Sequence, residues 1–180
     1  MKDALTFVHS VLKEILTKDD VTIDATCGNG HDTLFLAKES KFVYGFDIQE
    51  QAIRNTSKLL KDNKLDNYQL FLDSHRNIAN YLHTEVKAVT FNLGYLPGSD
   101  KTVITNKKET LIALDTIKDL LCVNGIISLI VYTGHPGGID ESNALLSYVE
   151  TLPKNRFQII KYTFLNRSKA PYVLLIEKTK

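Results

Sequence analysis

Apolar and polar residues recur along the chain with two different periods, which predict helices and strands in alternation. Leu5, Val8, Leu12 and Ile15 have the three- and four-residue spacing of an amphipathic helix. Short apolar runs bounded by glycine, asparagine or aspartate predict buried strands. The predicted helices span residues 1–17, 31–38, 51–60, 110–122 and 140–150, with a helical turn around 78–82. The first predicted strand begins at residue 21 and ends at Asp24, and the other predicted strands span 41–47, 68–72, 86–91, 125–132, 156–163 and 172–178.

The alternation of strands and helices predicts an α/β fold with a doubly wound, Rossmann-like sheet that is mostly parallel. Strand 125–132 is the most apolar, so we expect it near the centre of the sheet, after a helix that Asn124-Gly125 ends. The last two strands are predicted to form a hairpin, which makes the C-terminal strand antiparallel and places it at the edge. We expect a single domain over residues 1–180, because this length suits one core.

Composition and charge exclude several classes of protein. Hydrophobic residues make up 43% of the chain and charged residues 24%, as in ordinary globular proteins. No run approaches the ~18 apolar residues of a membrane helix, and no export signal is evident at the start. Cys27 and Cys122 have no metal-binding spacing, which indicates a reducing cytoplasm and no structural metal. The net charge of +1 leaves only a local patch as a basis for nucleic-acid binding.

The stretch from Val21 to Gly30 predicts a cofactor-binding loop. An apolar strand ends at Asp24, and Gly28 and Gly30 follow in a turn that a side chain would obstruct. The helix predicted next directs free N–H groups into the same turn. A small polar ligand is therefore expected at this position.

The spacing of the glycines argues against a dinucleotide site. The nicotinamide fingerprint requires a third glycine three residues after the second, but Gly30 is followed by His31, Asp32 and Thr33. No Walker A lysine follows the turn either. A nicotinamide-dependent oxidoreductase therefore remains only as an alternative function.

The Asp-x-x-x-Gly-x-Gly turn with an acid at the end of the next strand resembles the class I methyltransferase fold. The resemblance implies S-adenosylmethionine as the cofactor, with the methionine part against the turn, the ribose at the second acid and the adenine near the exit of the third strand. One departure is Thr26, where the family commonly has a further glycine. The residues that match these cofactor-binding roles are Asp24, Gly28, Asn29 and Gly30, then Asp47 and Gln49, then Asp73, Ser74 and His75.

The exit of the fourth strand, Asn92-Leu93-Gly94-Tyr95, resembles the acceptor loop of amino-group methyltransferases with its proline pair replaced. An amide oxygen accepts the hydrogens of an amine and aims its lone pair at the methyl group, while an aromatic ring stacks on a flat acceptor. We expect Asn92 to orient the amine and Tyr95 to stack on the base. His135, in a glycine-rich loop after the next strand, is the residue that we expect to accept the proton of the amine.

Five sequence blocks together resemble the MnmM (YtqB) family of bacterial methyltransferases. They are Asp-Ala-Thr-Cys-Gly-Asn-Gly-His-Asp-Thr, Gly-Phe-Asp-Ile-Gln, Ser-His, Phe-Asn-Leu-Gly-Tyr-Leu-Pro-Gly-Ser-Asp-Lys and Tyr-Thr-Gly-His-Pro-Gly-Gly. The resemblance implies methylation of the amine of 5-aminomethyl-(2-thio)uridine at the wobble position of tRNA, giving 5-methylaminomethyl-(2-thio)uridine. It also implies a homodimer. The expected RNA contacts are Lys101, Lys107 and Lys108 after the acceptor loop, and Arg167 and Lys169 in the last hairpin.

Three further interpretations remain open. The chain is compatible with an rRNA methyltransferase or a small-molecule amine methyltransferase, since the turn does not identify the acceptor. It is also compatible with a module that keeps the fold and binds S-adenosylmethionine without turning it over. Asp24 and Asp47 also have plain interpretations, as a turn cap and a solvated strand end.

Overall fold

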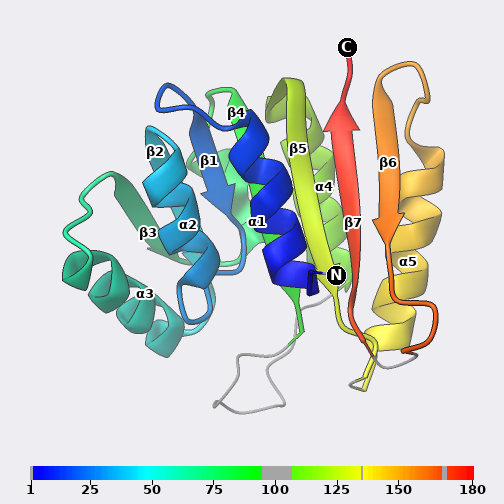
Figure 1. The fold of residues 1–180 in the computed structure, drawn as a ribbon, viewed down its shortest axis with the longest axis horizontal. Helices are drawn as coiled ribbons and strands as arrows, with labels where there is room; N and C mark the ends of the chain where they lie inside the picture. The colour runs from blue at the N-terminus through cyan, green and yellow to red at the C-terminus, as the bar shows by residue number, and fades with distance from the viewer. Residues whose placement is uncertain (1, 95–106, 135, 168–169) are drawn as a thin grey trace.

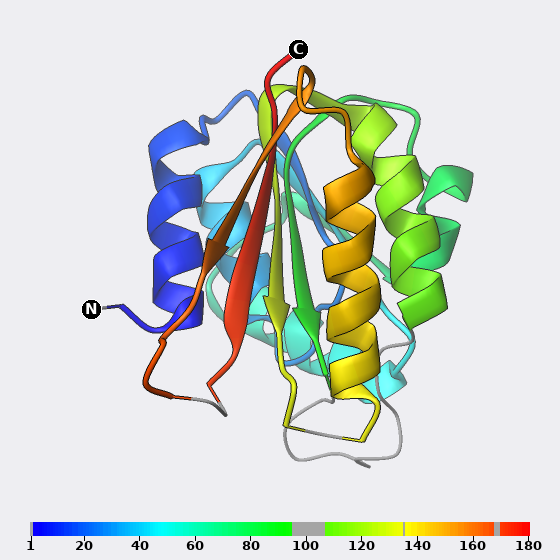
Figure 2. The ribbon, with the colours of Figure 1, turned by 90° about the vertical axis from the view of Figure 1, so that its right-hand side faces the viewer.

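The computed structural model describes residues 2–94, 107–134, 136–167 and 170–180. The described residues form one seven-stranded sheet with helices on both faces, as the two ribbon views show (Figure 1, Figure 2). The elements in chain order are α1 (Ala4–Ile15), β1 (Val21–Asp24), α2 (His31–Glu39), β2 (Phe42–Asp47), α3 (Glu50–Asp62), β3 (Tyr68–Leu72), the 3-10 helix η1 (His75–Asn80), β4 (Val86–Leu93), α4 (Lys107–Leu120), β5 (Leu121–Val131), α5 (Gly138–Thr151), β6 (Phe157–Tyr162) and β7 (Tyr172–Lys178).

The strands are ordered β3-β2-β1-β4-β5-β7-β6. The first five of these pair in parallel, and β7 is antiparallel to both of its neighbours, which confirms a mostly parallel sheet with an antiparallel C-terminal strand. The predicted edge position of that strand is wrong, because β6 forms the edge and β7 lies inside it. The reason is composition: residues 172–176 of β7 are buried throughout, whereas β6 is exposed at most positions. A continuous apolar strand needs cover on both faces.

Amphipathic helices bury their apolar faces against the two sides of the sheet. One core cluster includes Val8 and Leu12 of α1 and Leu36 of α2, and the other includes Ile117 of α4 and Leu145 of α5. Figure 2 shows the resulting layers, with α1 on one side of the sheet and α4 and α5 on the other. Each fully buried aliphatic side chain contributes about 1.5–3 kcal/mol relative to exposure. The sheet is thus held rigidly from both sides.

The start of β5 differs from the prediction. Helix α4 ends at Leu120, and Cys122 belongs to the strand and not to the end of the helix, where the sequence pattern places it. Asn124 has a positive φ of 59°, and a Cβ on Gly125 would lie 2.8 Å from the carbonyl oxygen of Cys122. Asparagine and glycine both favour turns, and this pair bends the chain. The bend lies within β5 and not at the end of the helix.

Two other boundaries shift. β4 extends through Leu93, so Asn92 lies in the strand and not in a loop. The predicted helical turn around 78–82 begins earlier, at His75, because the hydroxyl of Ser74 accepts a hydrogen bond from the backbone N–H of Arg76. The carboxyl end of β4 is therefore held by strand pairing, which fixes the position of Asn92 against its neighbours.

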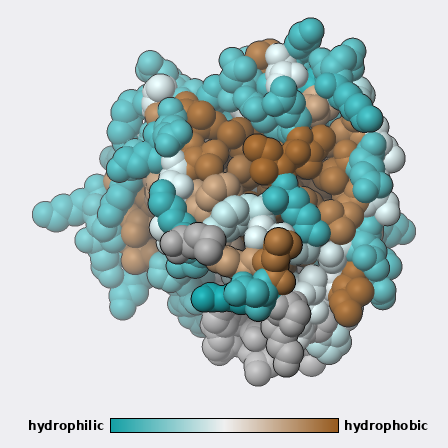
Figure 3. Space-filling model, turned by 45° about the vertical axis from the view of Figure 1, so that its right-hand side comes forward, coloured by the Kyte–Doolittle hydropathy of each residue, from teal (hydrophilic) through white to brown (hydrophobic). Residues whose placement is uncertain are grey.

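On the face toward α1, Val173 and Leu175 of β7 belong to the core cluster that includes α1, whereas most positions of the edge strand β6 are exposed (Figure 1). Tyr162 on this face stacks on Phe7 of α1 with 4.0 Å between ring centroids, while Ile160 remains 57% exposed. Figure 3 shows a band of apolar surface on the side of the molecule turned toward the viewer. Among the helices of the described residues, none is both long and apolar enough to cross a membrane.

Candidate active site

The carboxyl ends of β1 and β4 lie side by side at the point where the order of the strands reverses. Chain connections run outward from β1 toward β3 on one side and from β4 toward β5 on the other. In open parallel sheets, ligands bind in the crevice at this switch point. Asp24 ends β1 and Asn92 lies near the end of β4, so both predicted site residues flank it.

The turn after β1 is tied to the end of β2. Gly28 and Gly30 have positive φ values of 54° and 83°, which side chains rarely adopt. Asp47 accepts hydrogen bonds of 2.9 Å from the backbone N–H groups of Gly28 and Gln49, one on each carboxylate oxygen. Burial raises the pKa of Asp47, and these N–H groups oppose that shift because they favour the charged form. Asp47 is half-buried.

Asp24 acts inside the turn. Its side chain has no exposed surface, and its carboxylate accepts hydrogen bonds from the Thr33 hydroxyl at 2.5 Å and from the Thr26 N–H at 3.2 Å. Burial and the nearby carboxylate of Asp32 raise the pKa of Asp24 to about 7. The plain interpretation of Asp24 as a turn cap fits this geometry, whereas a direct cofactor contact has no exposed side-chain surface to use. Cys27 is also buried, and burial raises the pKa of its thiol.

Asn29 is held by a different element of the fold. Its side-chain oxygen accepts a hydrogen bond of 3.0 Å from the amide of Asn55 in α3, and the Thr56 hydroxyl contacts the Gly28 carbonyl oxygen at 3.4 Å. A Cβ on Gly30 would lie 2.9 Å from the backbone of Thr56. Helix α3 therefore packs directly against the turn and leaves room only for glycine at position 30.

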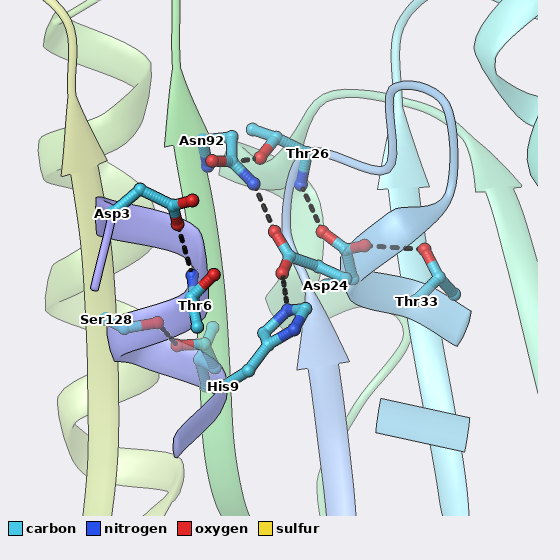
Figure 4. A network of polar contacts seen from close by, with 10 residues as sticks. Asp3, Thr6, His9, Asp24, Thr26, Thr33, Asn92 and Ser128 are labelled. Carbon is cyan, nitrogen blue, oxygen red and sulfur yellow. Dashed lines mark hydrogen bonds and ion pairs between the residues drawn. The ribbon is translucent and has the colours of Figure 1, made fainter. Parts of the chain in front are cut away.

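Asn92 is fixed through both its backbone and its side chain, as Figure 4 shows. Its backbone N–H donates a hydrogen bond of 2.6 Å to the Thr26 hydroxyl, and its side-chain amide donates to the carboxylate of Asp32. The other carboxylate oxygen of Asp32 lies 2.5 Å from Nε2 of His9 in α1. Three segments far apart in the sequence thus meet at the end of β4.

The residues that directly follow β3, Asp73 and Ser74, form a second cluster of polar contacts. Asp73 accepts hydrogen bonds from the Tyr81 hydroxyl at 2.8 Å and from the Asn77 amide at 2.9 Å. Slight burial acts against them, but these bonds lower the pKa of Asp73. Ser74 donates a hydrogen bond of 2.7 Å to Glu109 of α4. These contacts hold the exit of β3 against η1 and α4.

His75 is turned inward behind the turn. Its Nδ1 lies 3.1 Å from the carbonyl oxygen of Ala25, while its buried Nε2 has no partner among the described residues. Burial lowers the pKa of His75, so the neutral ring is favoured. A carbonyl oxygen only accepts, so Nδ1 carries the proton and Nε2 is an acceptor.

Several predicted residues fall outside the described part of the chain. They are Tyr95, Lys101, His135 and Lys169. Lys107 and Lys108 begin α4, and Arg167 follows β6. All three residues are exposed, and they lie at the end of the sheet that carries the carboxyl ends of β1 and β4. The described chain therefore brings these basic residues to the same edge as the switch point.

The sequence prediction missed His9, Thr26 and Asp32 as parts of this site. Asp32 carried a local signal, since it is the second residue of a helix that follows a glycine turn, where an acid is favoured. His9 carried none, because its partner is 23 residues away in the chain. Within the described residues, no group of three or more His, Cys, Asp or Glu side chains is arranged to hold a metal ion.

A mostly parallel sheet with this strand order, an inserted antiparallel last strand, a glycine turn after β1 and an acid at the end of β2 define a class I methyltransferase. Comparison with known proteins specifies the family. Residues 43–178 match the family described as "Putative rRNA methylase", and the chain belongs to this family.

Relatives agree along nearly the whole chain. A protein of Arabidopsis thaliana named "tRNA (mnm(5)s(2)U34)-methyltransferase, chloroplastic" is 37% identical over 98% of this chain and 70% of its own length. A crystal structure described as a putative rRNA methylase from Clostridium thermocellum has a TM-score of 0.95 and 38% identity over 99% of this chain and 98% of that chain. A putative methyltransferase from Streptococcus mutans, crystallised in complex with SAH, has a TM-score of 0.94 and 38% identity over 99% of both chains.

Proposed function

We propose that this protein is an S-adenosylmethionine-dependent methyltransferase that methylates the amine of 5-aminomethyl-(2-thio)uridine at the wobble position of tRNA. The product is 5-methylaminomethyl-(2-thio)uridine. The observation that carries the proposal is the placement of Asn92 at the switch point, fixed from two sides beside the glycine turn. The name of the Arabidopsis relative, which aligns over nearly the whole chain, supports the choice of acceptor.

The residues around the turn fit S-adenosylmethionine. A carboxylate has about four acceptor positions, and two of those on Asp47 are taken by the N–H groups of Gly28 and Gln49. The remaining positions suit the two hydroxyl groups of a ribose. The turn from Asp24 to Gly30 contains no lysine or arginine, which suits a ligand without phosphates. The structure of the Streptococcus mutans relative with SAH, the product left by methyl transfer, supports the same ligand.

S-adenosylmethionine supplies a methyl group on a positively charged sulfur, and the lone pair of the acceptor nitrogen displaces that sulfur. Asn92 accepts one hydrogen of the amine on its side-chain oxygen and so aims the lone pair along the line of the methyl group. An alkylamine has a pKa of about 10 in water, so the site must favour the neutral amine. Our predicted roles for His135 in accepting the proton and for Tyr95 in stacking remain predictions.

The proposed RNA surface follows from the edge at which the site lies. Lys107, Lys108 and Arg167 are exposed there, and Lys101 and Lys169 are predicted to join them. Basic side chains at this edge position the backbone of the RNA while the base enters the switch point. The proposal therefore needs no separate RNA-binding domain.

We further propose that the protein acts as a homodimer in the cytoplasm, as one domain per chain. The edge strand β6, whose Ile160 is 57% exposed, supports contact with a second copy of the chain. A dimer places two sets of basic residues on one tRNA. Light scattering after gel filtration tests the oligomeric state, and a monomer at micromolar concentration contradicts this part of the proposal.

The test of the function uses purified protein, S-adenosylmethionine and bulk tRNA from a strain that lacks the gene. Mass spectrometry of the digested tRNA should show loss of the aminomethyl nucleoside and gain of the methylaminomethyl nucleoside. Asn92→Ala is the matched variant, which should bind cofactor and give little product. Parallel reactions contain ribosomal RNA from the same strain and a set of small amines, and methylation of either in place of tRNA refutes the assignment of the substrate.

A further inference from the structure

The carboxylate of Asp32 lies at the centre of a polar network at the carboxyl end of β4, beside the switch point. Its side chain is only 3% exposed, and one of its oxygens receives the amide of Asn92 while the other lies 2.5 Å from His9 Nε2. The atom of Asn92 that faces this carboxylate is the amide nitrogen, which donates to one of its oxygens. The side-chain oxygen of Asn92 is thereby directed away from Asp32. No described residue donates to that oxygen.

We propose that Asp32 and His9 are positioning residues for methyl transfer: together they hold the Asn92 amide in the one orientation that presents its oxygen to the acceptor amine. This inference rests on the proposed function and specifies the residues that prepare the site. Without a fixed acceptor opposite it, an asparagine amide is free to turn by 180° and to present NH₂ to the amine. An amide in that orientation repels the hydrogens of the amine and misdirects its lone pair.

His9 completes the arrangement from α1, which packs on the same face of the sheet as α2. Its ring stacks on Phe35 of α2 with 4.0 Å between centroids and 6° between planes, so the ring plane is fixed. The ring is 24% exposed, and the carboxylate that it contacts is not, so the pair connects a buried acid to the surface. Helix α1 therefore contributes to the site although it lies outside the glycine turn and the acceptor strand.

The first experiment separates positioning from cofactor binding. Asp32→Ala should lower kcat about tenfold or more, since small misplacements of a reacting group are costly, while KM for S-adenosylmethionine changes less than about threefold. Lys13→Ala is the matched control: Lys13 also joins α1 to α2, through a 3.7 Å ion pair with Glu39 away from Asn92. The control should keep the wild-type kcat, and an unchanged kcat in Asp32→Ala overturns the proposal.

An exchange of the two side chains tests the direction of the hydrogen bond without emptying the site. Asn92→Asp sets two carboxylates against each other and should lower kcat at least about tenfold. Asp32→Asn alone should keep most of the activity, because its amide oxygen still accepts from Asn92. The double variant should recover at least about fivefold over Asn92→Asp, because Asn at position 32 now donates to Asp at position 92. Effects that simply add overturn the proposal, and this test remains available if Asp32→Ala does not fold.

A spectroscopic measurement distinguishes failure of this inference from failure of the proposed function. The side-chain ¹⁵N–¹H signals of Asn92, identified by their loss in Asn92→Asp, should shift in Asp32→Ala and stay in place in Lys13→Ala. If the signals behave in this way while no tRNA product forms with wild-type protein, the substrate is wrong and the positioning stands. If wild-type protein methylates tRNA and the signals do not respond to Asp32→Ala, the positioning is wrong.

Discussion

The backbone N–H of Gly28, in the turn after β1, donates a hydrogen bond of 2.9 Å to Oδ2 of Asp47 at the end of β2. This bond joins the two segments to which we assign the methionine part and the ribose of the proposed cofactor. One side chain therefore holds the turn and, in the proposed binding mode, also accepts from the ligand.

Asp47→Ala should weaken binding of S-adenosylmethionine at least about tenfold, which corresponds to about 1.4 kcal/mol, as measured by calorimetry. The variant loses the acceptor of the Gly28 N–H and the acceptors of the ribose hydroxyls together. Glu50→Ala is the control, since Glu50 is an exposed acid three residues further on, paired with Arg54 at 2.6 Å. Wild-type affinity in Asp47→Ala contradicts the assigned role.

The basic residues at the end of the sheet where β1 and β4 end should govern the affinity for RNA. They should not change kcat at saturating tRNA. Lys107→Glu with Lys108→Glu should weaken tRNA binding and reduce the steepness of its salt dependence by about one for each phosphate that the variant no longer neutralises. The control is Lys154→Glu with Arg156→Glu, which changes the charge by the same amount just before the start of β6. That position lies at the end of the sheet opposite to the carboxyl ends of β1 and β4. Equal effects of both pairs would mean that only net charge matters and that the proposed surface is misplaced.

Asp24 makes stability depend on pH in a defined direction. Its pKa is about 7 in the folded protein and 3.8 when it is free of the fold, so between these values the folded state holds a proton that the unfolded state has released. Its contribution is therefore full below about pH 4 and falls as pH rises toward 7. The free energy of unfolding of wild type, relative to Asp24→Asn, should decrease by more than about 1 kcal/mol between about pH 5 and pH 7.5.

Urea denaturation of both proteins at each pH measures this difference, and the comparison with Asp24→Asn removes the groups that titrate in both. Asp47, whose pKa is also raised by burial, adds to the fall in wild type and in the variant alike. A wild-type stability that rises relative to the variant over this range would mean that Asp24 is ionised in the folded protein.

Gly30 is required by backbone geometry. Its φ of 83° and the 2.9 Å separation between a Cβ at this position and the Thr56 Cα predict that Gly30→Ala lowers the stability by about 1–3 kcal/mol. For a chain of this size, each kcal/mol corresponds to roughly 2–4 °C in Tm. Gly134→Ala is the control, because a Cβ there meets no atom within 4 Å and φ is not in the left-handed range. Similar Tm values for both variants would refute the close packing of α3 on the turn.

The sequence by itself determined the alternation of elements, the glycine turn, the acid that follows it at the end of β2 and the family resemblance of the acceptor motif. These features depend on neighbours within a few residues, where periodicity and turn chemistry are legible. Tertiary structure alone decided that β7 lies inside β6, that Asp24 is buried in the turn, and that His9, Asp32 and Asn92 meet at the end of β4. The meeting of His9, Asp32 and Asn92 in particular depends on contacts between segments far apart in the chain, which the spacing of neighbouring residues does not specify.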